Sequence, residues 1–250
     1  MSPELPFDAY GRYYDLLYRD KDSAAEAAYV CGVLERQGIV EGSLLELGSG
    51  TGRHGRLLAG RGYRVQGIER SPRMMAAAAT GGGFACQLGD ARSVRMGCRF
   101  DAVLSLFHVL SYQTSNEDLG AVFATAAAHL EAGGVFVFDA WYSPAVLAQR
   151  PSVRVKRMAD EETEILRIAE PTMLPNENRV DVHYTMVVRD RRHGSVQLLE
   201  ETHPMRHFSL PEIDWLAAAH GFRRVAAEEF LSGRVPGEDT WGVCFVLSNR

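Results

Sequence analysis

The pattern of apolar and polar positions is clearest between residues 44 and 58. The run from Leu44 to Leu47 is apolar except for Glu46. Glycines at positions 48, 50 and 52 alternate with polar residues, and a new apolar pair follows at Leu57 and Leu58. A short apolar run, a glycine-rich turn and a new periodic segment predict a buried strand, a tight loop and a helix, in that order.

Short apolar runs continue to alternate with helical segments up to about residue 142. Further strands are predicted at 63–68, 84–88, 101–107 and 135–138. Helices are predicted from Asp22 or Ser23 to Gln37, from Ser71-Pro72 onward and over 116–130, with capping residues or proline at their starts. Strands that alternate with helices predict an α/β fold with a mostly parallel sheet.

Residues 151–209 break this alternation. Apolar and polar residues alternate over 165–168, 180–188 and 196–205, and His193-Gly194 marks a turn between two of these runs. This pattern predicts an antiparallel β insert after the fifth strand. A helix over 211–220 and two strands, 224–230 and 242–247, follow it. We expect one domain over 1–250, with an N-terminal helical segment over 1–40.

Composition narrows the classes of function. The net charge of −5 argues against a nucleic-acid partner, and the basic clusters at 154–157 and 189–193 are expected to be solvated faces. The four cysteines, at positions 31, 86, 98 and 244, show no metal-binding spacing, which predicts reduced thiols in a cytoplasmic protein and no metal site. No segment is long and apolar enough for a membrane span, and no signal peptide is evident.

The glycine loop differs from the dinucleotide fingerprint. Its third glycine comes one position early, and Glu46 before the loop suits a cationic group such as an α-ammonium better than a pyrophosphate. Glu69 ends the next strand, 17 residues after Gly52, near the spacing at which a strand-end acid binds a ribose diol. Asp90 follows the third strand and could reach an adenine amino group. An amino-acid end, a ribose and an adenine thus each have an expected partner.

Five segments in this order resemble the class I S-adenosylmethionine-dependent methyltransferases. They are LLELGSGTG (44–52), VQGIERSPRMM (65–75), LGDAR (88–92), FDAVLSLFHVLSY (100–112) and LEAGGVFVFDAWY (130–142). The resemblance implies a Rossmann-like, seven-stranded, mostly parallel sheet with helices on both faces. It also implies S-adenosyl-L-methionine as cofactor, bound by Tyr14, Glu46, Gly48, Ser49, Gly50, Glu69, Arg70, Met74, Asp90, Ala91, Arg92 and Phe107.

The insert resembles that of the sugar N,N-dimethyltransferases, which act on nucleotide-linked aminosugars. The matching segments are 182–184, 200–203, Arg206, 208–221 and the aromatic segment 141–144. This resemblance implies a small-molecule acceptor and a homodimer in which the insert contributes to the interface and to the substrate pocket. Candidate substrate-side residues are Tyr10, Tyr13, Trp141, Tyr142, His203 and Arg206.

Two residues after the fourth strand are candidates for the catalytic base, because methyl transfer requires a neutral amine or an activated hydroxyl. His108 has a side chain that titrates near working pH, and Tyr112 stands where the resembled enzymes often carry a histidine. This difference leaves both N-methylation and O-methylation open. A core histidine at 108 and a Tyr112 that only lines the pocket are the structural alternatives.

Two other functions stay open from the sequence. One keeps the cofactor and takes a protein or RNA acceptor, although the lack of a basic face argues against RNA. The other is a non-catalytic dimeric binding protein on the same fold. The presence of Glu46, Glu69, Asp90 and the loop glycines argues against this last function.

Overall fold

Short apolar strands buried on both faces build the centre of the molecule, as expected for parallel strands covered by helices. The computed structural model describes residues 10–249. In this part of the chain, the central sheet has the order β3-β2-β1-β4-β5-β11-β10. The first five strands in this order are parallel, and β11 is antiparallel to both neighbours. The bounds are β1 Gly42–Leu47, β2 Tyr63–Glu69, β3 Phe84–Leu88, β4 Phe100–Ser105, β5 Leu130–Tyr142, β10 Phe222–Glu229 and β11 Gly242–Asn249.

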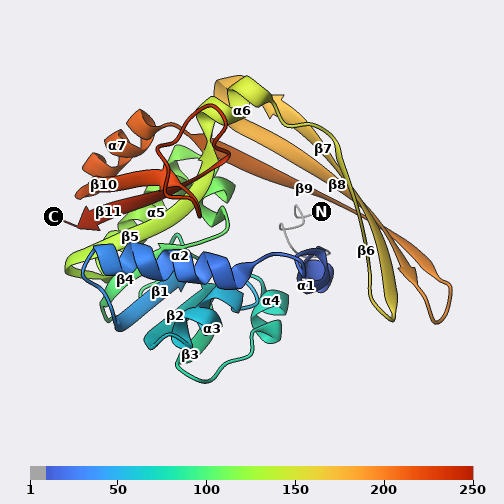
Figure 1. The fold of residues 1–250 in the computed structure, drawn as a ribbon, viewed down its shortest axis with the longest axis horizontal. Coiled ribbons are helices and arrows are strands. Elements are labelled where there is room, and N and C mark those ends of the chain that lie inside the picture. Colours follow the sequence, from blue (N-terminus) through green and yellow to red (C-terminus); the bar gives the residue numbers. More distant parts are fainter. Residues whose placement is uncertain (1–9, 250) are drawn as a thin grey trace.

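Helices cover both faces of this sheet (Figure 1). On one face, Val30 and Leu34 of α2 and Leu58 of α3 pack in one cluster with strand residues. On the other face, Phe123 of α5 and Ile213 of α7 belong to a second cluster. The helices that flank the sheet are α2 Ser23–Arg36, α3 Arg53–Ala59, α4 Pro72–Ala77, α5 Asn116–His129 and α7 Leu210–Ala219.

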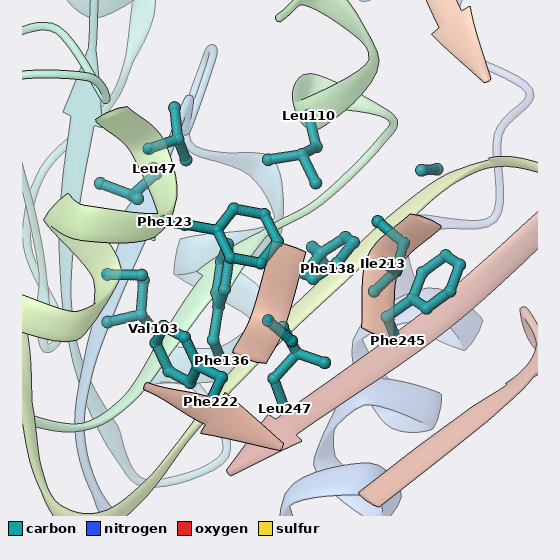
Figure 2. Packing of buried hydrophobic residues seen from close by; sticks show 14 of the residues in the cluster. Leu47, Val103, Leu110, Phe123, Phe136, Phe138, Ile213, Phe222, Phe245 and Leu247 are labelled. Atoms are coloured by element: carbon teal, nitrogen blue, oxygen red, sulfur yellow. The ribbon is translucent and has the colours of Figure 1, made fainter. Parts of the chain in front are cut away.

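Strand β5 shows how the sequence feeds both clusters. Successive side chains of a strand point to opposite faces, so Phe136 and Phe138 join the α5 side while Val135 and Val137 join the α2 side. Figure 2 shows Phe136 and Phe138 beside Phe123, whose ring meets that of Phe136 edge to face at 5.5 Å. All these phenylalanines are fully buried. This packing fixes β5 in the middle of the sheet.

The insert is an antiparallel sheet that continues from the central one. It contains β6 Arg154–Ala159, β7 Thr163–Leu174, β8 Arg179–Asp190 and β9 Val196–Phe208. Strand β9 joins β5 through the pairs Trp141↔His207 and Tyr142↔Phe208, and helix α6 (Ser143–Gln149) connects β5 to the insert. The single turn η3 (Pro175–Glu177) separates β7 from β8. The predicted fold class, including the antiparallel insert, is confirmed, with four insert strands joined to seven central ones.

Strand β6 covers the segment 154–157, which we expected to be only a solvated basic cluster. Apolar and polar residues do alternate along part of this strand, but the long cationic side chains make the pattern hard to recognise in the sequence. Met158 is buried and packs with Leu17 of α1 (Tyr14–Leu17), while Lys156 Nζ donates to the Leu17 carbonyl at 3.0 Å. The helix α1, which follows the single turn η1 (Tyr10–Tyr13), thus lies against one face of the insert, beside β6 (Figure 1).

Other expectations from composition can be compared with the described residues. Asp22 caps α2 by accepting the Ala25 amide at 2.9 Å. All four cysteines are free thiols, and two of them are buried. Within residues 10–249, no helix combines the length and the apolar character needed to cross a membrane.

The carboxyl group of Glu46 is buried inside the fold. Along β1, Leu45 and Leu47 face the α5 side, so Glu46 faces the opposite side with Leu44. Its side chain points at α3, because a Cβ added to Gly55 would lie 2.9 Å from Glu46 Oε2. The residue is 1% exposed. Burial, with a further contribution from the charge of Glu69, raises the pKa of Glu46 to about 8.

This raised pKa predicts that Glu46 makes stability depend on pH. The folded state holds the proton more tightly than the unfolded state does. The contribution of Glu46 is therefore fully present below pH 4.5 and is lost as pH rises towards about 8. The variant Glu46→Gln mimics the protonated form. We expect denaturant unfolding to show that the wild type loses stability relative to this variant across that range. Parallel stability curves would contradict the assignment.

Candidate active site

The glycine loop after β1 needs backbone conformations that favour glycine. Gly48, Gly50 and Gly52 have φ angles of 74°, 57° and 72°. A Cβ at Gly48 would also lie 2.5 Å from Val109 Cγ1, closer than real contacts allow. The amides of Gly48 and Ser49 donate to the carbonyl of Ile68 at 2.8 and 3.0 Å, which holds the loop against the end of β2.

Glu69 joins this loop to the next helix. Its Oε2 accepts the Gly50 amide and its Oε1 accepts the Ser71 amide, both at 2.8 Å. Ser71 in turn caps α4 by accepting the Met74 amide at 3.3 Å. Burial raises the pKa of Glu69, although these amides stabilise its charged form. Because each carboxylate oxygen has a second lone pair, the group can still accept hydroxyl donors from a ligand.

A cavity opens at the carboxyl ends of β1, β2 and β4, the position at which open α/β sheets bind ligands. All the predicted cofactor residues except Glu46 line it, namely Tyr14, Gly48, Ser49, Gly50, Glu69, Arg70, Met74, Asp90, Ala91, Arg92 and Phe107. Glu46 lies beneath the loop, on the side of α3. We had expected Glu46 to contact a cationic group of the ligand. In the structure its side chain does not line the cavity, because alternation along β1 turns it toward α3.

Asp90 is held by Arg92 at the far end of the cavity. The carboxylate accepts the Arg92 backbone amide at 2.9 Å and the guanidinium at 2.6 to 3.2 Å. These hydrogen bonds from Arg92 keep the pKa of Asp90 below its usual value. Arg92 also donates to Asp118 at 2.8 Å. Asp90 thus presents a fixed, ionised carboxylate to the cavity.

Cationic side chains gather near Tyr14, and the sequence interpretation missed them. Lys21 and Arg53 both line the cavity, together with Tyr18 and His54. Lys21 Nζ lies 2.6 Å from Glu26 Oε2, and burial lowers the pKa of Lys21. Arg53 donates to the Tyr18 carbonyl at 2.8 Å. Only the folding of the N-terminal segment over the loop brings these residues together, so no local motif marks them.

The backbone just after β4 is strained. Phe107 and His108 are both left-handed, with φ of 64° and 59°, a conformation that costs about 1–3 kcal/mol for a non-glycine residue. The buried carboxylate of Asp139 at the end of β5 accepts the Phe107 amide at 2.6 Å and the His108 amide at 3.1 Å. Burial alone would raise the pKa of Asp139, but His108, Lys21 and the Phe107 amide bring it below its usual value.

This strained pair separates two cavities. Phe107 lines both the cavity described above and a second one, and His108 lines only the second, with Asp139 and Trp241. His108 Nδ1 lies 2.8 Å from Asp139 Oδ2. Tyr112, in the turn η2 (Val109–Tyr112), lines the first cavity. The two candidate bases therefore lie in different cavities.

Tyr112 is linked to His203 of the insert. The tyrosine hydroxyl lies 2.8 Å from His203 Nδ1, and His203 Nε2 lies 2.8 Å from Glu201 Oε1. His203 is 2% exposed and Glu201 is 7% exposed. His203, which we had predicted on the substrate side, thus reaches the first cavity only through Tyr112.

The other predicted substrate residues are scattered. Trp141 lies edge-on to His108, with ring centroids 6.3 Å apart, but Tyr142 on the opposite face of β5 packs in the core. The Arg206 guanidinium pairs with Glu212 at 2.6 Å and also donates to the Thr114 carbonyl. Trp141, Tyr142 and Arg206 line neither cavity. Strand alternation turns Tyr142 into the core, and the ion pair with Glu212 holds Arg206. Tyr13 packs in the cluster that Leu17 of α1 and Met158 of β6 form between α1 and the insert. The Tyr10 side chain lies outside the described residues.

The chemistry of the first cavity matches a sulfonium nucleoside. Carboxylates of Glu69 and Asp90 suit ribose and adenine donors, apolar Ile68, Met74 and Leu106 lie along its wall, and Lys21 and Arg53 suit an α-carboxylate. Across the residues that the structure describes, no group of three or more histidine, cysteine, aspartate or glutamate side chains is placed to hold a metal ion.

Comparison with known proteins agrees with this chemistry. A family model described as a methyltransferase domain matches residues 44–134. A dTDP-3-amino-3,4,6-trideoxy-alpha-D-glucopyranose N,N-dimethyltransferase of Streptomyces venezuelae is 32% identical over 224 residues, which cover 88% of this chain and 93% of that protein.

Solved structures extend the similarity to the whole fold. A sugar N-methyltransferase of Streptoalloteichus sp. is 26% identical with a TM-score of 0.81, covering 100% of this chain and 98% of that one. An S-adenosylmethionine-bound amino pentose methyltransferase of Micromonospora echinaspora is 26% identical with a TM-score of 0.76, covering both chains completely. The chain is thus an S-adenosylmethionine-dependent methyltransferase, and it belongs to the family that contains the dTDP-aminosugar N,N-dimethyltransferases.

Proposed function

We propose that this enzyme methylates the amino group of a nucleotide-linked aminosugar. The observation that carries the proposal is the similarity to the Streptomyces venezuelae N,N-dimethyltransferase, which extends through the insert and covers 88% of this chain. The solved sugar N-methyltransferase structure supports the same class of acceptor. Aromatic side chains of Tyr18, Phe107 and Tyr112 line the cofactor cavity, where an acceptor would have to meet the methyl group.

The chain's own residues divide the work in this proposal. When bound, S-adenosylmethionine supplies an electrophilic methyl group on sulfur. Glu69 and Asp90 would hold the adenosine, and Lys21 and Arg53 would bind the carboxylate of the amino-acid end. Burial raises the pKa of Tyr14, so its hydroxyl stays protonated and can donate a hydrogen bond near that end. Holding the two reactants aligned supplies much of the rate of such a displacement.

We further propose that Tyr112, rather than His108, faces the acceptor. Tyr112 shares the first cavity with the glycine loop, whereas His108 lies in the other cavity, beyond Phe107. The role we assign to His108 is to hold Asp139 ionised beneath the strained turn. Of the aromatic residues predicted on the substrate side, Tyr13 and Trp141 remain candidates for the wall of the acceptor site, although neither lines the first cavity.

The function can be tested with purified enzyme and matched acceptors. We expect S-adenosylmethionine to convert a dTDP-linked aminosugar to the singly and then the doubly methylated product, followed by mass spectrometry. The hydroxy-sugar nucleotide of the same ring is the control and should gain no methyl group. Methylation of the hydroxy sugar alone would replace N-methylation by O-methylation, and no product with either nucleotide would reject the proposed acceptor class.

The role of Glu69 predicts a specific loss of cofactor affinity. The variant Glu69→Gln keeps the shape but loses the charge, and hydrogen bonds to charged groups contribute about 1.5–3 kcal/mol. Calorimetric titration should therefore show S-adenosylmethionine binding about 10- to 100-fold more weakly. The exposed acid Glu41, next to β1, provides the control Glu41→Gln, for which we expect wild-type affinity. Equal affinity in all three proteins would place the ribose elsewhere.

We also propose that the enzyme is a homodimer that pairs through the insert. One face of the insert packs against α1, whereas the other carries apolar residues in register across its strands. Leu198, Val187 and Leu166 are direct neighbours, and Val155 and Val196 are 54% and 63% exposed. A second copy can cover this face by placing the same apolar row against itself.

The dimer proposal predicts the effect of a charge on this face. Leu198 is 60% exposed, so Leu198→Asp should leave the fold intact and convert the dimer to a monomer in light scattering. Val235, 90% exposed in the segment between β10 and β11, offers the control Val235→Asp, which should remain dimeric. A monomeric wild type, or a dimeric Leu198→Asp variant, would contradict the proposal.

A further inference from the structure

A chain of three polar side chains runs from the cofactor cavity into the insert. Tyr112 from η2 lies at the cavity, His203 from β9 lies behind it, and Glu201 lies behind His203. Both links measure 2.8 Å between heavy atoms. Residues 201 and 203 point to the same face of β9, because side chains two positions apart share a face. The strand therefore delivers both groups behind one hydroxyl.

The chemistry of Glu201 determines the direction of these hydrogen bonds. With Glu201 ionised, its carboxylate can only accept, so His203 Nε2 donates to it. With the proton on Nε2, neutral His203 has Nδ1 as an acceptor, and the Tyr112 hydroxyl donates to it. A carboxylate this deeply buried needs such a partner, because an unpaired buried charge is strongly destabilising.

The surroundings hold this arrangement in place. Tyr184 packs edge-on against the His203 ring at 4.9 Å, and the Tyr112 ring lies 5.6 Å from it. Tyr112 ends η2, the turn that begins directly after the strained pair that Asp139 holds. The hydroxyl is thus fixed from two sides, by the end of β5 and by the insert.

We propose that Glu201 and His203 are positioning residues that make Tyr112 the proton acceptor for the substrate amine, an inference that rests on the proposed N-methylation. An ammonium N–H bond breaks as its proton passes to the Tyr112 oxygen, and the Tyr112 O–H proton passes to His203 Nδ1. The imidazolium so formed faces the Glu201 carboxylate. The new N–C bond then forms from the nitrogen lone pair, while the electron pair of the C–S bond stays with sulfur. The same groups return the proton to solvent after product leaves.

The order Tyr112, His203, Glu201 is similar to that of enzymes in which a third group orients a base and the base activates a hydroxyl. It depends on the pairs Trp141↔His207 and Tyr142↔Phe208, which join the insert to the central sheet. These pairs place the segment 201–208 beside η2. A shift of β9 by one residue would turn His203 to the opposite face of the sheet and break the link to Tyr112.

Variants of the three residues test the proposal through turnover and cofactor binding measured separately. General base catalysis contributes about 10²–10⁴-fold, so Tyr112→Phe should lower kcat at least about a hundredfold. His203→Gln should also lower kcat, because it removes the acceptor at Nδ1. Glu201→Gln should lower kcat too, because without the carboxylate the histidine tautomer with the proton on Nδ1 becomes more favourable. The acceptor KM and the Kd for S-adenosylhomocysteine should stay close to wild type in all three.

The double variant Tyr112→Phe with His203→Gln separates a proton path from simple packing. If His203 acts through the Tyr112 oxygen, its replacement should cost nothing further once that oxygen is gone. The control is His193→Gln, in the turn between β8 and β9. This side chain pairs with Asp190 at the end of β8 and is 77% exposed, so kcat should be unchanged.

Two results for kcat, and a third for cofactor binding, would overturn the proposal. One is wild-type kcat in both Tyr112→Phe and His203→Gln, and the other is a fully additive loss in the double variant. Neither can be confused with failure of the proposed function, because that failure appears as absent amine methylation by the wild-type enzyme. A rate loss accompanied by weaker S-adenosylhomocysteine binding would assign the residues to packing and reject the positioning role.

Discussion

The carboxylate of Asp139 is the constraint on which the active site depends. It accepts two successive backbone amides, those of Phe107 and His108, and so holds both residues in the left-handed conformation. Two residues in this conformation cost about 1–3 kcal/mol each, which the surrounding structure must offset. The offset comes from β5, which is buried between two aromatic and aliphatic clusters and cannot shift. The rigid core thus fixes the turn after β4.

That turn divides the chemistry of the site. Phe107 becomes the wall between two cavities, so the cofactor loop and Tyr112 share one space and His108 occupies another. The insert contacts Tyr112, at the edge of the first cavity, through His203. Its strands follow all five parallel strands in the sequence. The antiparallel insert therefore serves both the proposed acceptor chemistry and, through its opposite face, the proposed pairing of two copies.

Much of this architecture follows from local sequence patterns. Buried strands, the glycine loop and the helix after it depend on neighbouring residues, so they could be predicted, and so could Glu69 and Asp90 at strand ends. Glu46 was predicted at the cavity, whereas alternation along β1 turns its side chain toward α3. Strand β6 was missed because its cationic side chains hide the alternation.

Features that depend on tertiary contacts could not be predicted. His108 and Tyr112 are four residues apart and looked equivalent, until the strained turn placed them in separate cavities. Lys21 meets the loop only because the N-terminal segment folds over it. Glu201 comes close to the site only because β9 pairs with β5, which places His203 next to Tyr112 of η2. Charged residues in such positions look like ordinary surface residues along the chain.

A crystal structure of the enzyme with S-adenosylhomocysteine would test the central claim most directly. The account predicts the adenosine between Glu69 and Asp90, the carboxylate near Lys21 and Arg53, and the sulfur on the Tyr112 side of Phe107. A sulfur atom on the His108 side of Phe107, or a ligand away from the glycine loop, would contradict it.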